Sequence, residues 1–322
     1  MKKLKVMALI CAAAMLAGLF AGCGQSQTDS EPAPAPAPAE STISVSGQAV
    51  SITDMSGREI VITEPAQRIV ALTAADCEII YALGAGDKLV GRGEYCNWPA
   101  EVLEVPSVES GMETNIEQIL ALKPDVLFMS AMAQSEEQVK QLEDAGIKVI
   151  VSDAPDIAGT YTAISMIGVV LGKEAEALSV INGMKAQFDE IQAKVTGDGT
   201  QTVYFEVSPL EWGLWAAGKG TFMDEIANML GVKNIFGDVE GWAEVSEEQV
   251  IERNPDFIVT ISMYYGEGPT PTEEILSRQG WDVITAVKNQ AILNLQNDEL
   301  SRPAPRLAEG AQLMYDFIYG EK

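Results

Sequence analysis

Aromatic side chains are the residues of this sequence best suited to binding a ligand. They fall in segments predicted to follow β-strands, and their flat, largely apolar faces suit stacking on a wide and weakly charged molecule. Any single one could be an ordinary core or surface residue, but their recurrence in several such segments favours a binding surface. The candidates are Tyr95, Trp98, Trp212, Trp215, Trp242, Tyr264 and Tyr265.

Polar and sulfur-containing residues near these aromatics offer further contacts. Arg302 could donate several hydrogen bonds to amide or carboxylate oxygens of a ligand, or it could pair with Asp298 or Glu299 in the protein itself. We expect Met112, Ser130 and Met132 to line the same ligand-binding cleft, where flexible methionine side chains can adapt to the shape of a ligand.

Lys219 lies in a Gly-Lys-Gly-Thr segment that superficially suggests a phosphate-binding loop. The four-residue spacer between glycines and the Gly-Lys-Ser/Thr ending of that motif are both absent. Phosphate binding is therefore not expected here.

The chain contains no histidine, the usual acid–base residue near neutral pH and the commonest metal ligand. Ser-His-Asp and Cys-His catalysis, His-ligated zinc and His-ligated haem are thereby excluded. Of four cysteines, Cys11 lies in the N-terminal leader and Cys23 at its end, which leaves too few for a four-thiolate metal site. Cys77 and Cys96 could form a disulfide in an oxidising compartment, or remain a buried thiol and a loop thiol.

Net charge and length further limit which class of protein this chain can belong to. The 322 residues hold 47 Asp and Glu against 21 Lys and Arg, a formal charge of -26, which argues against nucleic-acid binding. With 47% hydrophobic residues, the chain can fill the cores of roughly two domains.

The N-terminal segment has the form of an export signal. Residues 1–22 combine a basic start, an apolar run and small residues before Cys23, and residues 23–46 include a polar stretch and a Pro-Ala repeat. Cys23 resembles the lipid attachment site of bacterial lipoproteins, and the Pro-Ala stretch predicts an extended spacer. We therefore expect a globular part tethered by lipid to the cell membrane, outside the cytoplasm.

Two series of alternating strands and helices come after the leader. An N-terminal α/β lobe with a mainly parallel sheet is predicted over residues 47–155, beginning with a hairpin that turns near Met55 to Gly57. Residues 156–198 have no convincing strand, and apolar residues at helical spacing predict one long helix from Glu174 to Val195. A second α/β lobe is predicted over residues 199–322.

The two series resemble each other internally. Asn115 to Gln118, followed by Lys123-Pro124-Asp125, matches Ser246 to Gln249, followed by Asn254-Pro255-Asp256. Each copy predicts a capped helix with a capping box and an exposed first-turn carboxylate, Glu117 or Glu248. A pseudo-symmetric pair of charges could meet a pseudo-symmetric partner. Glu78-Ile79 similarly recurs as Glu225-Ile226.

Over about residues 50 to 320, the chain resembles the helical-backbone substrate-binding proteins of bacterial ABC importers, which bind cobalamin, ferric siderophores or haem. In the cobalamin-binding members a Tyr-x-x-Tyr-Pro segment is similar to Tyr95 to Pro99, with Trp98 in place of the second tyrosine. The resemblance is carried by Arg68 to Leu72, Glu78 to Gly84, Leu89 to Gly91, Tyr95 to Pro99, Asn115 to Asp125 and Ser301 to Arg306.

This resemblance implies two pseudo-symmetric three-layer α/β lobes joined by one long rigid helix, with a ligand cleft between them. It also implies that Glu117 and Glu248 dock onto arginines of the membrane permease, which works with an ATPase. The protein would act as a monomer, without a cofactor and without chemistry on its ligand.

A corrinoid, cobalamin or cobinamide, fits the aromatic segments best, because it is broad, flat and weakly charged. A ferric siderophore or haem is the alternative ligand, with Tyr95, Tyr264 or Met112 as a haem iron ligand. A lipid-anchored hydrolase with paired carboxylates is the alternative of another class, although no such pair lies among the aromatic segments. An adhesion or sensor lipoprotein on the same scaffold is a third interpretation.

Overall fold

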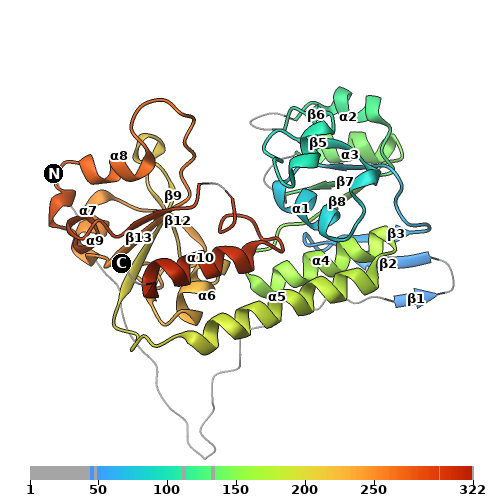
Figure 1. Ribbon diagram of the computed structural model, residues 1–322. Coiled ribbons are helices and arrows are strands. Elements are labelled where there is room, and N and C mark those ends of the chain that lie inside the picture. Colours follow the sequence, from blue (N-terminus) through green and yellow to red (C-terminus); the bar gives the residue numbers. More distant parts are fainter. Residues whose placement is uncertain (1–43, 47–48, 111–113, 132–134, 297, 321–322) are drawn as a thin grey trace, which may run out of the picture. The chain divides into compact units, whose positions relative to one another are not determined.

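The computed structural model shows an α/β protein whose elements are drawn in Figure 1. Within the described part of the chain no helix is long and apolar enough to span a membrane. The predicted leader, with Cys23 and most of the spacer, lies outside the described residues. The structure describes residues 44–46, 49–110, 114–131, 135–296 and 298–320.

The N-terminal lobe is built on a parallel sheet with strand order β6-β5-β4-β7-β8. The central strands β4 and β7 have only buried residues, as expected for parallel strands covered on both faces. The strands are β4 (Ile69–Ala71), β5 (Leu89–Gly93), β6 (Ser107–Val108), β7 (Val126–Met129) and β8 (Lys148–Val151).

Helices cover both faces of this sheet, which gives the lobe three layers. α2 and α3 pack on one face in one apolar cluster, whereas α1 packs on the other face together with the helices of the connector. The predicted hairpin is confirmed, and a further strand extends it to a three-stranded antiparallel sheet. These elements are α1 (Ala74–Ala82), α2 (Ile116–Leu122), α3 (Glu136–Asp144), β1 (Ser44–Ser46), β2 (Ala49–Thr53) and β3 (Glu59–Ile62).

Two helices, α4 (Ile157–Leu171) and α5 (Glu174–Lys194), link the lobes. α4 ends at Gly172, whose left-handed backbone (φ 65°) lets the chain reverse into α5. At 21 residues α5 is about 31 Å long, and it confirms the predicted long helix. α4 lies along α5, and the last helix of the chain packs against α5 as well (Figure 1).

The C-terminal lobe has a mixed sheet with strand order β12-β10-β9-β13-β14, and β11 also pairs with β9. β9, β11, β13 and β14 are parallel, but β10 and β12 are antiparallel to their neighbours. The strands are β9 (Thr202–Ser208), β10 (Trp215–Ala217), β11 (Lys233–Asn234), β12 (Trp242–Glu244), β13 (Phe257–Thr260) and β14 (Ile292–Asn294).

Helices again cover both faces of this second sheet. One apolar cluster combines α6 and α10 with the connector, and a separate cluster lies under α7, α8 and α9. The helices are α6 (Phe222–Met229), α7 (Glu247–Arg253), α8 (Pro271–Ser277), α9 (Thr285–Lys288) and α10 (Leu307–Tyr319). Short 3-10 helices are η1 (Gly86–Lys88), η2 (Ala100–Glu104), η4 (Leu210–Trp212) and η5 (Trp281–Val283).

Candidate functional site

A pocket of about 490 Å³ opens in the C-terminal lobe where β9 and β13 end. Its walls come from the end of β9 and the segment after it, residues 207–212, and from the segment between β13 and α8 together with Pro271 and Glu274 of α8. Carboxyl ends of parallel strands are the usual place for a ligand in an open α/β sheet. Three aromatic candidates from the sequence meet here: Trp212, Tyr264 and Tyr265. Trp212 and Tyr265 are each 72% exposed, so their rings are available to a ligand.

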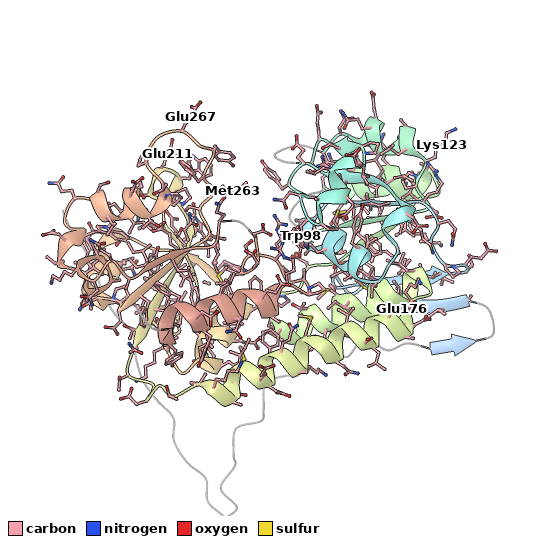
Figure 2. The ribbon with its side chains drawn as sticks, in the orientation of Figure 1. Trp98, Lys123, Glu176, Glu211, Met263 and Glu267 are labelled. Atoms are coloured by element: carbon pink, nitrogen blue, oxygen red, sulfur yellow. The ribbon has the colours of Figure 1, made fainter. Side chains whose placement is uncertain are left out.

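Carboxylates, and no lysine or arginine, line this pocket beside the rings. Glu211 and Glu267 are exposed, and within the described residues neither makes a hydrogen bond or an ion pair. Glu274 is bonded to Arg278. Figure 2 shows Glu211, Glu267 and Met263 on the same side of the C-terminal lobe. The pocket therefore presents aromatic rings, and its charged lining residues are all carboxylates.

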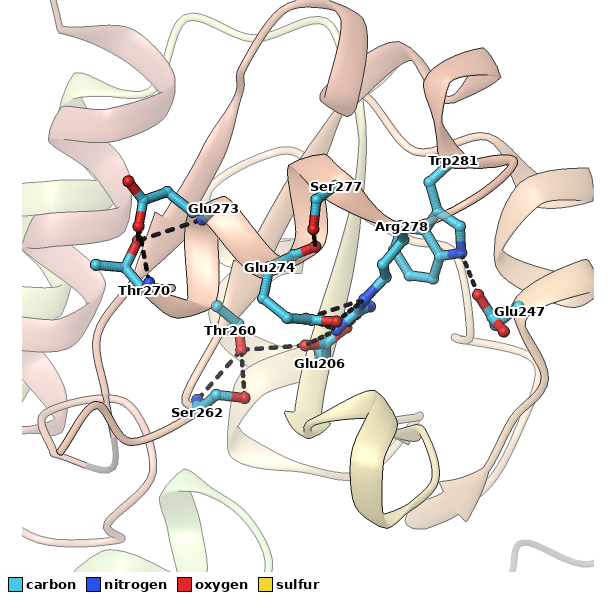
Figure 3. A network of polar contacts seen from close by, with 10 residues as sticks. All are labelled: Glu206, Glu247, Thr260, Ser262, Thr270, Glu273, Glu274, Ser277, Arg278 and Trp281. Atoms are coloured by element: carbon cyan, nitrogen blue, oxygen red, sulfur yellow. Dashed lines mark hydrogen bonds and ion pairs between the residues drawn. The ribbon is translucent and has the colours of Figure 1, made fainter. Parts of the chain in front are cut away.

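Beneath the pocket lies a buried polar network (Figure 3). The Arg278 guanidinium contacts Glu206 of β9 at 2.6 Å and Glu274 of α8 at 2.5 Å, and the Arg278 and Glu206 side chains are only 2% and 1% exposed. Burial raises the pKa of Glu206, against the lowering effect of the Arg278 hydrogen bond. Arg278 also lies 4.4 Å from the centroid of the Trp281 ring. The network fixes α8 against the sheet.

The same network reaches the pocket wall through hydroxyl groups. Thr260 Oγ1 donates to Glu206 Oε1 at 3.4 Å and lies 3.0 Å from the hydroxyl of Ser262, a lining residue. The sequence pattern did not lead us to predict this network. The acidic residue Glu206 among the buried residues of β9 could have indicated it, because a buried carboxylate needs a partner.

Trp215 and Trp242 lie outside the lining of this pocket. The prediction that they lie in segments leaving strand ends is wrong, because they lie within the antiparallel strands β10 and β12. Trp215 faces Glu244 and Trp242 faces Ala217, so both rings share one face of the ribbon. They are 40% and 42% exposed. Trp242 also packs edge-on against Phe222, with 5.5 Å between ring centroids.

Tyr95 and Trp98 lie in the N-terminal lobe, in the loop after β5, and both are exposed. Trp98 lines a second pocket of about 450 Å³, to which Pro305 and Arg306 contribute from the C-terminal part of the chain. The Arg306 guanidinium lies 4.2 Å from the centroid of the Trp98 ring. Tyr95 lines neither pocket.

Arg302 occupies a position unlike the one expected for a ligand donor. It is 6% exposed, and its guanidinium contacts Glu78 of α1 at 2.8 Å and Asp298 at 3.4 Å. Asp298 is thus one of the partners that the sequence analysis offered, whereas Glu299 pairs with Arg306. Burial raises the pKa of Glu78, and the hydrogen bond from Arg302 opposes that rise. These contacts favour a role in holding the two lobes together.

Glu117 and Glu248 lie in the first turns of α2 and α7, and both are exposed. The predicted capping box is present in α7, where Gln249 accepts from the Ser246 backbone. In α2 it is absent, because the Gln118 side chain accepts from the Glu109 backbone instead.

Of the other sequence candidates, the described residues Ser130 and Lys219 do not line either pocket. Met112 and Met132 lie outside the described residues, whereas Ser130 comes after β7 and is half-buried. Lys219 forms a surface ion pair with Glu240 at 3.0 Å. Among the described residues no group of three or more Cys, Asp or Glu is placed to hold a metal ion.

Comparisons with known proteins identify the family. The periplasmic binding protein family matches residues 69–299. An uncharacterized ABC transporter substrate-binding lipoprotein of Bacillus subtilis is 36% identical, with 84% of this chain and 85% of the relative covered. A vitamin B12-binding protein of Salmonella paratyphi A is 28% identical, with 77% and 88% covered.

A solved structure of similar fold is that of a possible iron-binding, periplasmic solute-binding protein from Staphylococcus epidermidis. It is 34% identical with a TM-score of 0.67, and the match covers 80% of this chain and 100% of the other. The chain therefore belongs to the periplasmic binding proteins, the extracytoplasmic solute-binding components of ABC transporters.

Proposed function

We propose that this solute-binding protein captures a corrinoid, cobalamin or cobinamide, and delivers it unchanged to an ABC importer permease and its ATPase. The observation that carries the proposal is the pocket of the C-terminal lobe, which combines exposed rings with carboxylates and has no basic lining residue. The vitamin B12-binding relatives support the same ligand class.

The chemistry of the ligand is constrained by this lining. A corrin ring offers a broad flat face to Trp212 and Tyr265, and its amide arms offer N–H donors to Glu211 and Glu267. Ligands with several carboxylates or catecholates would place like charges beside these glutamates, which costs binding energy. The pocket thus favours a neutral or cationic ligand over a polyanionic one.

The remaining candidates are proposed to complete the binding surface around this pocket. Trp215 and Trp242 would extend it along the β10–β12 ribbon, and Tyr95 and Trp98 would contact the ligand from the N-terminal lobe. Arg302 would act by pairing with Glu78 across the lobes, because its guanidinium is already bonded to protein carboxylates.

A ferric siderophore or haem is the second candidate ligand. Met263, Tyr264 and Tyr265 line the pocket, and a phenolate or thioether can serve as an iron ligand. The similarity to a possible iron-binding protein supports this candidate. The hydrolase alternative has less support, since Glu206 and Glu274, which share one site, are both ion-paired with Arg278.

Acylation of Cys23 is proposed to anchor the protein to the outer face of the cell membrane. The basis is the leader with its small residues before Cys23 and the spacer behind it. Changing Cys23→Ser should move the protein from the membrane fraction to the soluble exported fraction. Unchanged membrane association would show that the anchor lies elsewhere.

Titration with a panel of ligands tests the choice of ligand. Trp fluorescence of the purified protein is followed while cyanocobalamin, cobinamide, haem and a ferric hydroxamate are added in separate experiments. We expect saturable binding of a corrinoid, with weaker binding of haem because of its propionates. Tight binding of haem or the hydroxamate, with no response to either corrinoid, would replace the corrinoid by an iron chelate and leave the receptor role intact.

A further inference from the structure

Two buried cysteines lie close to each other, and one of them, Cys96, belongs to the segment that carries Tyr95 and Trp98. Cys77 lies in α1 and Cys96 in the loop after β5, and their exposed fractions are 0% and 1%. Both are free thiols in this structure. Their sulfur atoms share one acceptor, the carbonyl oxygen of Ala71, at 3.7 Å from Cys77 and 3.9 Å from Cys96.

Both cysteines belong to one core cluster, and the proximity of Cys96 is the largest cause of the raised pKa of Cys77, with burial adding to it. Because both sulfur atoms lie beside the same carbonyl oxygen, a bond between them would form within a single packed site.

A close approach of two strands brings the cysteines together. At Gly93, the last residue of β5, an added Cβ would lie 2.1 Å from the backbone oxygen of Leu72. Only glycine allows these two segments of the backbone to come this close. The Cys96 backbone N–H then donates to the Gly93 carbonyl at 3.2 Å, which turns Cys96 toward α1.

We propose that Cys77 and Cys96 are joined by a disulfide in the exported protein, which ties the Tyr95–Trp98 segment to α1. The proposal depends on export to an oxidising compartment, where disulfides persist, and is independent of the ligand. Its consequence is a fixed position for the Trp98 ring, which contacts Arg306 from the C-terminal part of the chain.

The bond would form by exchange with the disulfide of an exported protein oxidant or a small-molecule disulfide. The Cys96 thiolate attacks one sulfur of that disulfide and releases the other as a thiolate, giving a mixed disulfide. The Cys77 thiolate then attacks the Cys96 sulfur and releases the second oxidant thiolate. The two cysteine protons end on the two released sulfurs, so the cysteine pair loses two electrons and the oxidant gains them. Because both thiols are buried in the folded lobe, the exchange belongs to folding.

Peptide mapping of the full chain tests the bond directly. The protein is produced in an exporting host, denatured in N-ethylmaleimide without reductant, digested and measured by mass spectrometry. We expect the Cys77 and Cys96 peptides as one linked species that separates after reduction. Complete N-ethylmaleimide labelling of both peptides, in exported protein and in protein refolded with oxidised glutathione, would overturn the proposal.

Thermal unfolding tests the proposed tether. The bond closes a loop of about 20 residues, so the midpoint of the oxidised protein should lie about 5–10 °C above that of the same protein refolded in reductant. The double variant Cys77→Ala/Cys96→Ala should lack this difference between oxidised and reduced samples. Equal midpoints for oxidised and reduced wild-type protein would contradict a stabilising tether.

Discussion

The two lobes share a scaffold and differ in the surface placed on it. In both lobes one helix, α2 or α7, ends at a residue with left-handed backbone, Lys123 or Asn254, and a proline comes next. The next aspartate then accepts backbone N–H groups at the start of the central strand: Asp125 from Arg68 and Asp256 from Thr202. These repeated residues fix a helix to a strand. The repeat therefore preserves framework, and it does not by itself locate a ligand.

The lobes differ in the segment that leaves the central strand. β4 leads directly into α1, whereas β9 is followed by the 3-10 helix with Trp212 and by β10 with Trp215 before α6 begins. The pocket of about 490 Å³ belongs to this additional segment and its neighbour after β13. The C-terminal lobe thus carries a candidate surface with no counterpart in the segment after β4, although the two frameworks are similar.

The repeated glutamates Glu78 and Glu225 occupy corresponding helices, α1 and α6, but bond different partners. Glu78 contacts Arg302 near the C-terminus, and Glu225 accepts the Ile157 backbone N–H at the start of α4, at 2.8 Å. Both carboxylates bond a distant segment of the chain from the corresponding helix of their lobe. This shared position indicates that the repeat also holds the lobes to the connecting parts of the chain.

Removing Arg278 from the C-terminal lobe should produce the largest loss of stability. Changing Arg278→Met leaves the buried Glu206 without its partner, which typically costs about 3–5 kcal/mol of unfolding free energy. Urea unfolding measures this loss. Lys219→Met, which breaks an exposed ion pair in the same lobe, should cost less than about 1 kcal/mol. Similar small losses for both variants would contradict the importance of the buried network.

Asp76 should make the N-terminal lobe sensitive to pH. Burial raises its pKa from 3.8 to about 7, although hydrogen bonds from Thr73 and Ser152 oppose the rise. The folded state therefore holds a proton that the unfolded state releases between about pH 4 and 7. Stability should fall as pH rises through this window, by up to about 1.4 kcal/mol per pH unit, and then level off.

The variant Asp76→Asn tests this dependence. It cannot ionise, so its unfolding free energy should vary less between pH 5 and 7 than that of the wild-type protein. Urea unfolding at several pH values gives both slopes. Parallel slopes for the two proteins would assign the pH dependence to other groups.

Aromatic truncation compares the two lobes as ligand surfaces. Trp212→Ala should weaken corrinoid binding about thirtyfold, or ~2 kcal/mol, because the exposed ring forms the pocket wall. Trp98→Ala should cost less, about fivefold or ~1 kcal/mol, because Arg306 already covers part of that ring. Leu178→Ala, an exposed change on α5, is the control. A larger loss for Trp98→Ala would reverse the ranking of the lobes.

The smallest effect on ligand affinity is expected at Glu117 and Glu248, the first-turn carboxylates that the two lobes share. Glu117 and Glu248 are exposed and absent from the lining of either pocket, so the double change to Ala should alter affinity less than about threefold, or ~0.7 kcal/mol. Uptake by cells should nevertheless be lost if both charges dock onto the permease. Glu136→Ala/Glu137→Ala, in the first turn of α3, provides the matched control for uptake. Normal uptake by the Glu117/Glu248 variant would exclude the docking role.

Much of the framework could be predicted from periodicity and caps. The caps Asn115 and Ser246 correctly predict where α2 and α7 begin, and the helix predicted from Glu174 to Val195 ends one residue earlier, at Lys194. These segments have regular apolar spacing and strong end signals. The strands β10 and β12 were missed because each has three residues, too few to show alternation.

The candidate site was only partly predictable for a different reason. Trp212 and Tyr264 were correctly expected in segments after parallel strands, where the pocket opens. The partners of Arg302 and Arg278 could not be read from local sequence, since Glu78 lies 224 positions from Arg302 and Glu206 lies 72 from Arg278. Pairing over such distances is decided by how the sheets and helices pack.

Mass spectrometry of the ligand released from protein purified from its own membranes decides whether the pocket binds a corrinoid. The protein is isolated without added ligand, denatured, and its small-molecule fraction measured for mass and for cobalt and iron. A corrinoid mass with cobalt equimolar to the occupied protein is the expected result. An iron chelate or haem, with no cobalt, would contradict the account of the pocket as a corrinoid site.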